Sequence, residues 1–191
     1  MESVPPHPKP KWELEQYLTP SYIASTIVWT AYVRGEIENK RVADLGCGTG
    51  RFCLGISALG GHCTCVDIDR DSLEVAKSTL RTIDAEAEFV EADCNSFNGR
   101  FDTAIQNPPF GNAVRGIDLN FLRKALEIAN TVYSIHRSNP KSREIIIREA
   151  NSKGFKVETI ELAFPLLAYY PWHREKVHKI LVDIYSFRKV S

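Results

Sequence analysis

Val42-Ala43-Asp44-Leu45-Gly46-Cys47-Gly48-Thr49-Gly50 is the stretch that decides the fold of this 191-residue sequence. Its first four residues form a mostly apolar strand pattern, and the three glycines that follow predict a tight turn that opens a helix. A dinucleotide-binding turn would have its third glycine where Arg51 stands, and a phosphate loop would need Gly-Lys-Ser/Thr after the turn. The stretch therefore predicts a strand, a turn and a helix that bind a different ligand.

Strand and helix patterns alternate around this unit. After a helix predicted at 12–35, strands at 41–45, 61–67, 87–92, 101–106 and 131–135 alternate with helices at 50–59, 71–83, 119–129 and 141–153. Two last strands, at 155–162 and 176–187, are joined by residues without helical periodicity, which indicates that the final strand is antiparallel. The expected fold is α/β and Rossmann-like, a seven-stranded mostly parallel sheet with an antiparallel final strand and helices on both faces, and it resembles class I methyltransferases.

The composition is that of one globular domain, with 43% hydrophobic and 25% charged residues. We expect a flexible Pro-rich tail at 1–11 and a single domain at 12–191. Apolar runs are much shorter than the roughly 20 residues of a membrane helix, so no membrane span is predicted. The N-terminus has no secretory signal pattern, so a cytoplasmic protein is expected.

The cysteines are odd in number and form no Cys-x-x-Cys pair: Cys47, Cys53, Cys63, Cys65 and Cys94. We therefore predict that they are reduced. Cys63 and Cys65 form the only close pair, and no second pair completes a zinc site, so no metal is expected.

Charge is balanced overall but uneven along the chain. Residues 42–110 contain 5 basic and 11 acidic side chains, whereas residues 111–191 contain 14 and 8. A basic second half suits a surface that binds a polyanion, but an ordinary solvated surface explains the split equally well.

Acidic residues follow the next two strands. The Asp-x-Gly-x-Gly-x-Gly pattern at 44–50 resembles the loop that binds S-adenosylmethionine, and an acid about twenty residues later can accept hydrogen bonds from ribose hydroxyls. Asp67 fits this role, whereas Asp69 is placed to cap the following helix. Asp93 is placed to hold an adenine amine, with the Cys94 amide near the ring.

Asn107-Pro108-Pro109-Phe110 follows the fourth strand and resembles the catalytic motif of amino-group methyltransferases. A ring-conjugated amine is a poor nucleophile, so its site must supply acceptors for both N–H groups. The Asn107 side-chain oxygen and the Pro108 carbonyl can be these acceptors, held by the fixed φ angles of the prolines, and Phe110 can stack on the base.

These motifs, together with 14–19, 116–122 and 132–136, resemble the methyltransferase-like protein five family over residues 11–191. The resemblance implies transfer from S-adenosylmethionine to N6 of an adenosine in small-subunit ribosomal RNA, with a small zinc-binding adaptor protein as partner. It implies these cofactor contacts: Gln16, Tyr17, Thr19, Asp44, Gly46, Gly48, Thr49, Gly50, Arg51, Asp67, Ile68, Asp93 and Cys94.

Cations and aromatic residues occur together in the loops after the fourth, fifth and sixth strands, which share one rim of the sheet. They suit phosphate contacts and stacking on unpaired bases, although a partly buried aromatic cluster explains them as well. His7, His62 and His178 are expected to be structural or surface residues. The candidate RNA contacts are Arg115, Arg137, Tyr169, Tyr170, Trp172, His173, Arg174 and Lys176.

The third strand should lie at an edge of the sheet, where another chain can add a strand. Glu86 to Val90 is therefore the candidate docking segment for the adaptor, although a capped edge is a close alternative. Two kinds of function stay open beside RNA adenine methylation: a methyltransferase for guanine N2 or protein glutamine, and a non-catalytic ribosome assembly factor. We expect either the RNA or the whole ribosomal subunit as the substrate.

Overall fold

The computed structural model describes residues 1–167 and 177–190. Its order is η1 (Trp12–Leu14), α1 (Ser21–Val33), β1 (Arg41–Leu45), α2 (Arg51–Ala58), β2 (His62–Asp67), α3 (Arg70–Arg81), β3 (Glu88–Glu91), η2 (Cys94–Ser96), β4 (Phe101–Gln106), α4 (Ile117–Ile128), β5 (Ala129–Arg137), α5 (Pro140–Ser152), β6 (Phe155–Leu167) and β7 (Val177–Lys189). Among the described residues, no helix is both long enough and apolar enough to cross a bilayer.

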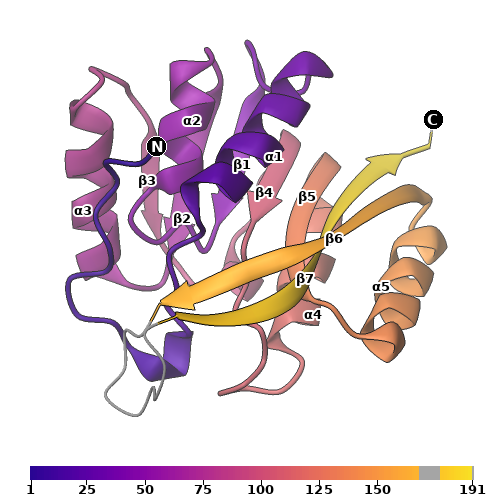
Figure 1. Cartoon of the computed structure of the whole chain (residues 1–191). Coiled ribbons are helices and arrows are strands. Elements are labelled where there is room, and N and C mark those ends of the chain that lie inside the picture. The colour runs from indigo at the N-terminus through magenta and orange to yellow at the C-terminus, as the bar shows by residue number, and fades with distance from the viewer. Residues whose placement is uncertain (168–176, 191) are drawn as a thin grey trace.

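The strands form one sheet in the order β3-β2-β1-β4-β5-β7-β6 (Figure 1). β7 runs antiparallel to both β5 and β6, and the pairs on the other side of β5 are parallel. This confirms the predicted fold class. The chain leaves β1 toward β2 on one side, and β4 lies on the other side, so the strand order reverses between β1 and β4. In such sheets ligands bind beyond the carboxyl ends of the strands at this switch point.

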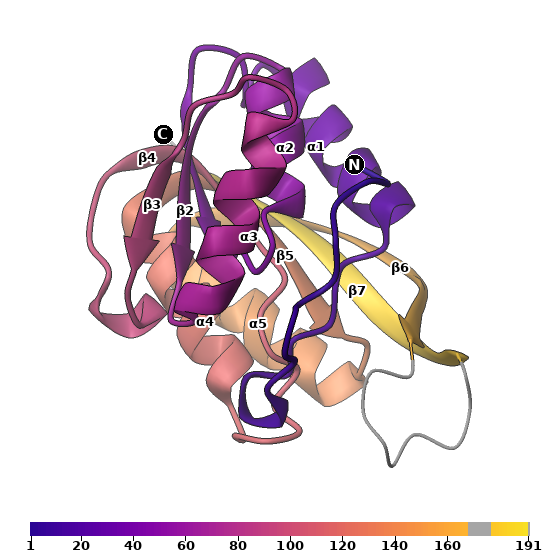
Figure 2. The same ribbon diagram turned by 90° about the vertical axis from the view of Figure 1, so that its left-hand side faces the viewer.

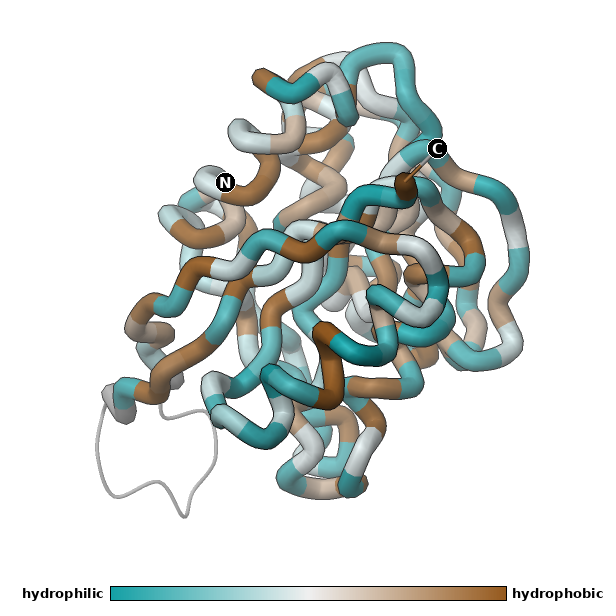
Figure 3. The backbone as a smooth tube through the Cα atoms, turned by 90° about the vertical axis from the view of Figure 1, so that its right-hand side faces the viewer, coloured by the Kyte–Doolittle hydropathy of each residue, from teal (hydrophilic) through white to brown (hydrophobic). Residues whose placement is uncertain are grey.

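Two hydrophobic cores lie on the two faces of the sheet. One contains buried residues of α1, α2 and α3, such as Ile27, Ile56 and Leu80, and the other contains buried residues of α4 and α5, such as Leu122 and Ile146. Figure 2 shows the sheet between these helices, and Figure 3 shows hydrophobic residues distributed along the strands. The helices thus cover both faces, as the alternating pattern predicts.

The first helix begins later than predicted, at Ser21 instead of near residue 12. Pro20 occupies the position before the helix, and a proline within a helix from 12 to 35 would remove a backbone hydrogen bond and clash with the preceding turn. After the short η1, residues 15–20 belong to no helix or strand. The apolar spacing in this region serves a pocket and not a helix.

The prediction that all cysteines are reduced is wrong for one pair. Cys53 of α2 and Cys63 of β2 form a disulfide, with Cα atoms 5.6 Å apart, a separation that suits such a bond. Residues 54–62 between them turn α2 back onto β2, a contact that no local sequence pattern shows. Cys47, Cys65 and Cys94 are buried free thiols.

Candidate active site

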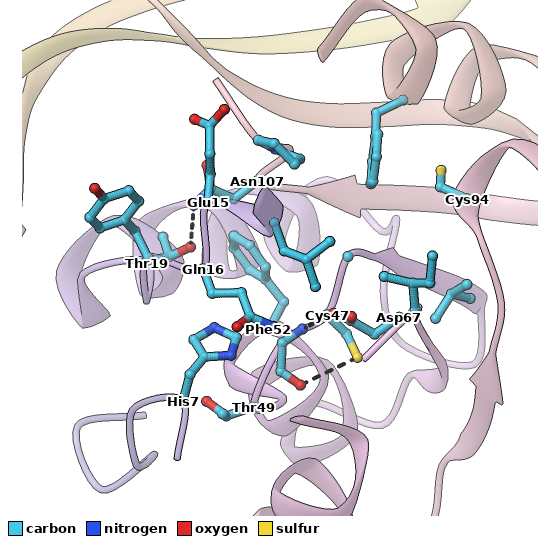
Figure 4. A pocket seen from close by; sticks show the side chains of 18 of the residues that line it. His7, Glu15, Gln16, Thr19, Cys47, Thr49, Phe52, Asp67, Cys94 and Asn107 are labelled. Atoms are coloured by element: carbon cyan, nitrogen blue, oxygen red, sulfur yellow. Dashed lines mark hydrogen bonds between the residues drawn. The ribbon is translucent and has the colours of Figure 1, made fainter. Parts of the chain in front are cut away.

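A pocket lies where β1, β2 and β4 end, and His7 of the N-terminal segment is among its lining residues (Figure 4). The glycine loop, the ends of the strands and the segment 14–19 all contribute to its wall. The pocket brings together most of the predicted cofactor contacts: Gln16, Tyr17, Thr19, Gly46, Gly48, Thr49, Arg51, Asp67, Ile68, Asp93 and Cys94. Asp44 and Gly50 do not line it.

The glycine loop is held to β2 by its own backbone. The amides of Gly46 and Cys47 both donate to the carbonyl oxygen of Val66, at 2.8 and 3.0 Å, and the amide of Gly48 donates to Asp67 Oδ2 at 2.8 Å. Gly46 has φ +69°, and a Cβ there would come within 3.2 Å of the Phe121 ring. The loop therefore needs glycine to keep the wall of the pocket open.

Asp44 lies underneath the loop, fully buried. Its Oδ2 accepts a hydrogen bond from the amide of Cys53 at 3.3 Å, and burial raises the pKa of its carboxyl to about 8. Its place indicates that it supports the turn between β1 and α2 from below the pocket.

Asp67 and Asp69 have different environments. Asp67 lines the pocket, and burial raises the pKa of its carboxyl. Burial alone would also raise the pKa of Asp69, but hydrogen bonds from Lys11 (2.6 Å), Gln16 (2.6 Å) and Ser72 (2.8 Å) outweigh it and lower that pKa to about 2. Asp69 therefore ties the N-terminal segment to the start of α3, where it stands at the N-cap.

Asp93 and Cys94 lie at the end of β3, also on the pocket wall. Asp93 Oδ1 accepts a hydrogen bond from the amide of Asn95 at 2.8 Å and is otherwise exposed. Burial raises the pKa of the Cys94 thiol to about 12, so this group stays protonated at neutral pH and is not a nucleophile.

The Pro-rich N-terminal residues, expected as a flexible tail, pack along the domain toward the pocket (Figure 2). Val4 is 3% exposed, and its carbonyl accepts from Arg51 Nη2 at 3.2 Å. Thr49 Oγ1 donates to the carbonyl of Pro5 at 2.7 Å, and the Arg51 guanidinium also donates to the carbonyl of Thr19. The side chains of Thr49 and Arg51 thus hold this segment against the glycine loop.

His7 is a pocket residue that sequence reasoning missed. Its Nδ1 lies 2.8 Å from Ser72 Oγ, and its Cε1 lies 2.9 Å from where a Cβ on Gly48 would be. Burial lowers the pKa of the ring to about 4, although the carboxylate of Asp69 opposes this. The ring is therefore neutral at physiological pH. No local pattern around a histidine between prolines signals such a contact.

Asn107 follows β4 directly and faces the pocket (Figure 4). Its Nδ2 donates to Thr19 Oγ1 at 3.0 Å, and its buried Oδ1 has no hydrogen-bond partner among the described residues. Pro109 also lines the pocket, Pro108 is buried, and the Phe110 ring meets Phe164 edge-on at 5.8 Å. The tetrad therefore brings Asn107, with its free acceptor, and Pro109 to the pocket wall, whereas Pro108 and the half-buried Phe110 ring do not line it.

The predicted RNA contacts are only partly described. Arg115 is exposed in the loop after β4 and Arg137 is exposed at the end of β5, and Arg137 Nη1 lies 3.5 Å from Asn112 Oδ1. The other predicted contacts, Tyr169, Tyr170, Trp172, His173, Arg174 and Lys176, lie outside the described residues.

The predicted docking segment Glu86 to Val90 overlaps β3, which stands at an edge of the sheet as expected. Phe89 and Val90 are half-buried there, and Lys77 Nζ lies 5.7 Å from the centre of the Phe89 ring. The other edge strand is β6.

Comparison with known proteins agrees with this geometry. Residues 25–132 match the model of the methyltransferase small domain. The chain is 38% identical over 189 residues to rRNA N(6)-adenosine-methyltransferase METTL5 of Danio rerio, covering 94% of this chain and 90% of that protein. It is 35% identical over 205 residues to an uncharacterized protein of Methanocaldococcus jannaschii, covering 100% and 92%. A crystal structure of a Pyrococcus horikoshii protein matches with a TM-score of 0.93 and 38% identity, covering 100% and 94%.

Proposed function

The chain belongs to the methyltransferase small domain family, as an S-adenosylmethionine-dependent enzyme related to the METTL5 rRNA methyltransferases, and from this premise we propose its reaction and substrate. It transfers a methyl group to N6 of an adenosine in structured RNA. The RNA is small-subunit ribosomal RNA, and the target base is unpaired or flipped out when it enters the site.

The free acceptor of Asn107 carries this proposal. A buried polar atom without a partner costs about 1–3 kcal/mol, so an acceptor left free beside the pocket suits a ligand that brings its own donor. One oxygen of Asp44 and that of Gln106 are also unpartnered among the described residues, but neither residue lines the pocket. An exocyclic amine has two N–H groups, and the Pro108 carbonyl is the second acceptor proposed for it.

The cofactor residues have roles that fit their places. Bound S-adenosylmethionine supplies an electrophilic methyl group. Asp67 accepts hydrogen bonds from its ribose, the backbone of Gly46 and Gly48 approaches it closely, and Asp93 with the Cys94 amide holds its adenine. The Asn107 side-chain oxygen and the Pro108 carbonyl accept from the two N–H groups of the substrate amine, and the methylated amine nitrogen loses its surplus proton to water, so no general base is needed.

The substrate and the partner contact two other parts of the surface. Phe110 stacks on the target base, while Arg115 and Arg137, with the segment 169–176, contact the RNA backbone and unpaired bases. The adaptor protein adds a strand at Glu86 to Val90, because an edge strand presents unpaired backbone groups.

The test is methyl transfer from labelled S-adenosylmethionine to total RNA and to small ribosomal subunits, followed by nucleoside analysis. N6-methyladenosine in small-subunit RNA is the expected product. The variant Asn107→Ala should give none, while Asn130→Ala, an exposed asparagine near the start of β5, should match the wild type. Label in guanine N2 or in protein glutamine would replace the proposal with a rival reaction, and binding of the cofactor without any transfer would favour an assembly factor.

A further inference from the structure

Glu15 lies between the cofactor pocket and the loop that follows Asn107, and it has no part in the roles described above. Its side chain is 6% exposed and lines the pocket. In Figure 4 its carboxylate points away from the glycine loop, on the side where Asn107 lies. A buried carboxylate needs strong hydrogen-bond donors, and within the described part of the chain one loop supplies three of them.

Both carboxylate oxygens of Glu15 accept hydrogen bonds from residues 110–113. Oε2 accepts from the backbone amide of Phe110 at 3.0 Å and from Asn112 Nδ2 at 2.8 Å. Oε1 accepts from the backbone amide of Ala113 at 2.9 Å. Hydrogen bonds to a charged acceptor are about twice as strong as neutral ones, so this carboxylate fixes the loop at three points.

The backbone of Glu15 is also unusual. Its φ is +47°, in the left-handed region that side chains other than glycine rarely adopt. The other described non-glycine residues with positive φ are Asn39 and Asp84. Asparagine and aspartate tolerate this conformation, but glutamate rarely adopts it. Glu15 is also the C-cap of η1, where its amide donates to the Trp12 carbonyl at 3.0 Å, so the end of this helix and the loop contacts of the side chain together determine its conformation.

We propose that Glu15 is a positioning residue for the target base: its carboxylate holds residues 110–113 so that the Phe110 ring is in place to stack on that base. The part of the inference that concerns the base rests on the proposed function. The part that concerns the loop does not, because it follows from the contacts of Glu15 alone.

The variant Glu15→Gln tests both parts. An amide of the same size has one acceptor oxygen, and its NH2 group would face a donor of the loop, so at least one of the three contacts is lost. Hydrogen exchange should become at least tenfold faster at the amides of Phe110 and Ala113 and stay unchanged in β4. With RNA, kcat/KM should fall at least tenfold, while the Kd of S-adenosylmethionine stays within twofold. Glu13→Gln, an exposed neighbour, should change none of these values.

A second variant tests the same contact in case Glu15→Gln does not fold. Asn112 is exposed, so Asn112→Ala removes one of the three donors without touching the core, and it should shift exchange in the same direction by a smaller factor. Unchanged exchange at 110–113 in both variants would overturn the inference about the loop. Faster exchange with an unchanged kcat/KM would overturn the inference about the base. If the wild type itself methylates no adenosine, the proposed function fails while the exchange result still decides the role of Glu15.

Discussion

The neutral, buried ring of His7 predicts that acid weakens the packing of the N-terminal segment. Burial lowers the pKa of this ring from 6.5 to about 4, so the unfolded chain binds a proton more readily than the folded one. The stability that His7 contributes is complete above pH 6.5 and is lost as the pH falls toward 4. At pH 5 the free energy of unfolding is lower by about 2 kcal/mol, which is 1.36 kcal/mol per pH unit over the interval from pH 6.5 to pH 5.

The assay is urea unfolding of the wild type and of His7→Gln at pH 7.5 and at pH 5. Glutamine can keep a hydrogen bond to Ser72 but does not titrate in this range. Other groups such as Asp44, whose pKa burial raises to about 8, titrate in both proteins, so the difference between them isolates His7. The wild type should lose about 2 kcal/mol more than the variant between the two pH values. Equal losses in both proteins would refute the assignment of a neutral buried ring.

Three other perturbations have expected outcomes. Asn107→Ala should lower kcat by about 10²-fold or more, as the removal of one acceptor or donor at a reacting centre commonly does, with the Kd of the cofactor within twofold by calorimetry. Gly48→Ala should destabilise the protein by about 1–3 kcal/mol in urea unfolding and weaken cofactor binding, because Gly48 has φ +53° and the new Cβ would lie 2.9 Å from His7 Cε1. An unchanged urea midpoint would contradict that contact. Reduction of the Cys53–Cys63 disulfide should cost about 2–3 kcal/mol, seen as a lower urea midpoint with dithiothreitol that the variant Cys53→Ser does not show.

The fold was predictable because its signals are local. The strand 41–45 and the strand 101–106 have the predicted bounds in the structure, since each is a short apolar run next to a strong turn signal. The direction of the final strand also followed from local evidence, namely the lack of helical periodicity in the sequence between the last two strands. Pro20, in contrast, was overlooked as a boundary within an apolar pattern that matched a helix, which explains the error at 12–20.

The candidate site was predictable for side chains that directly follow a strand. It was not predictable for contacts between residues that are far apart in the sequence. Asp67, Asp93 and Asn107 follow parallel strands whose carboxyl ends lie side by side in the sheet. Their positions in the sequence therefore predict that they line the same pocket. His7 and Glu15 contact residues 65 and 97 positions away, and only the tertiary structure defines such contacts. The disulfide between Cys53 and Cys63 depends likewise on how α2 packs on β2.

The N-terminal segment has a consequence for the order in which the chain becomes folded. It leaves the ribosome before its partners, because Pro5, His7 and Glu15 contact residues 44, 65 and 97 positions later in the chain. Contacts of such long range form slowly, because the intervening chain must first be ordered. During synthesis Pro5 and His7 can therefore dock once Thr49 and Ser72 have emerged, whereas the Glu15 carboxylate has its partners only after the loop beyond β4 has emerged. The pocket is complete only when the residues up to Phe121 have been made, so a nascent fragment that ends before β4 should fail to bind the cofactor.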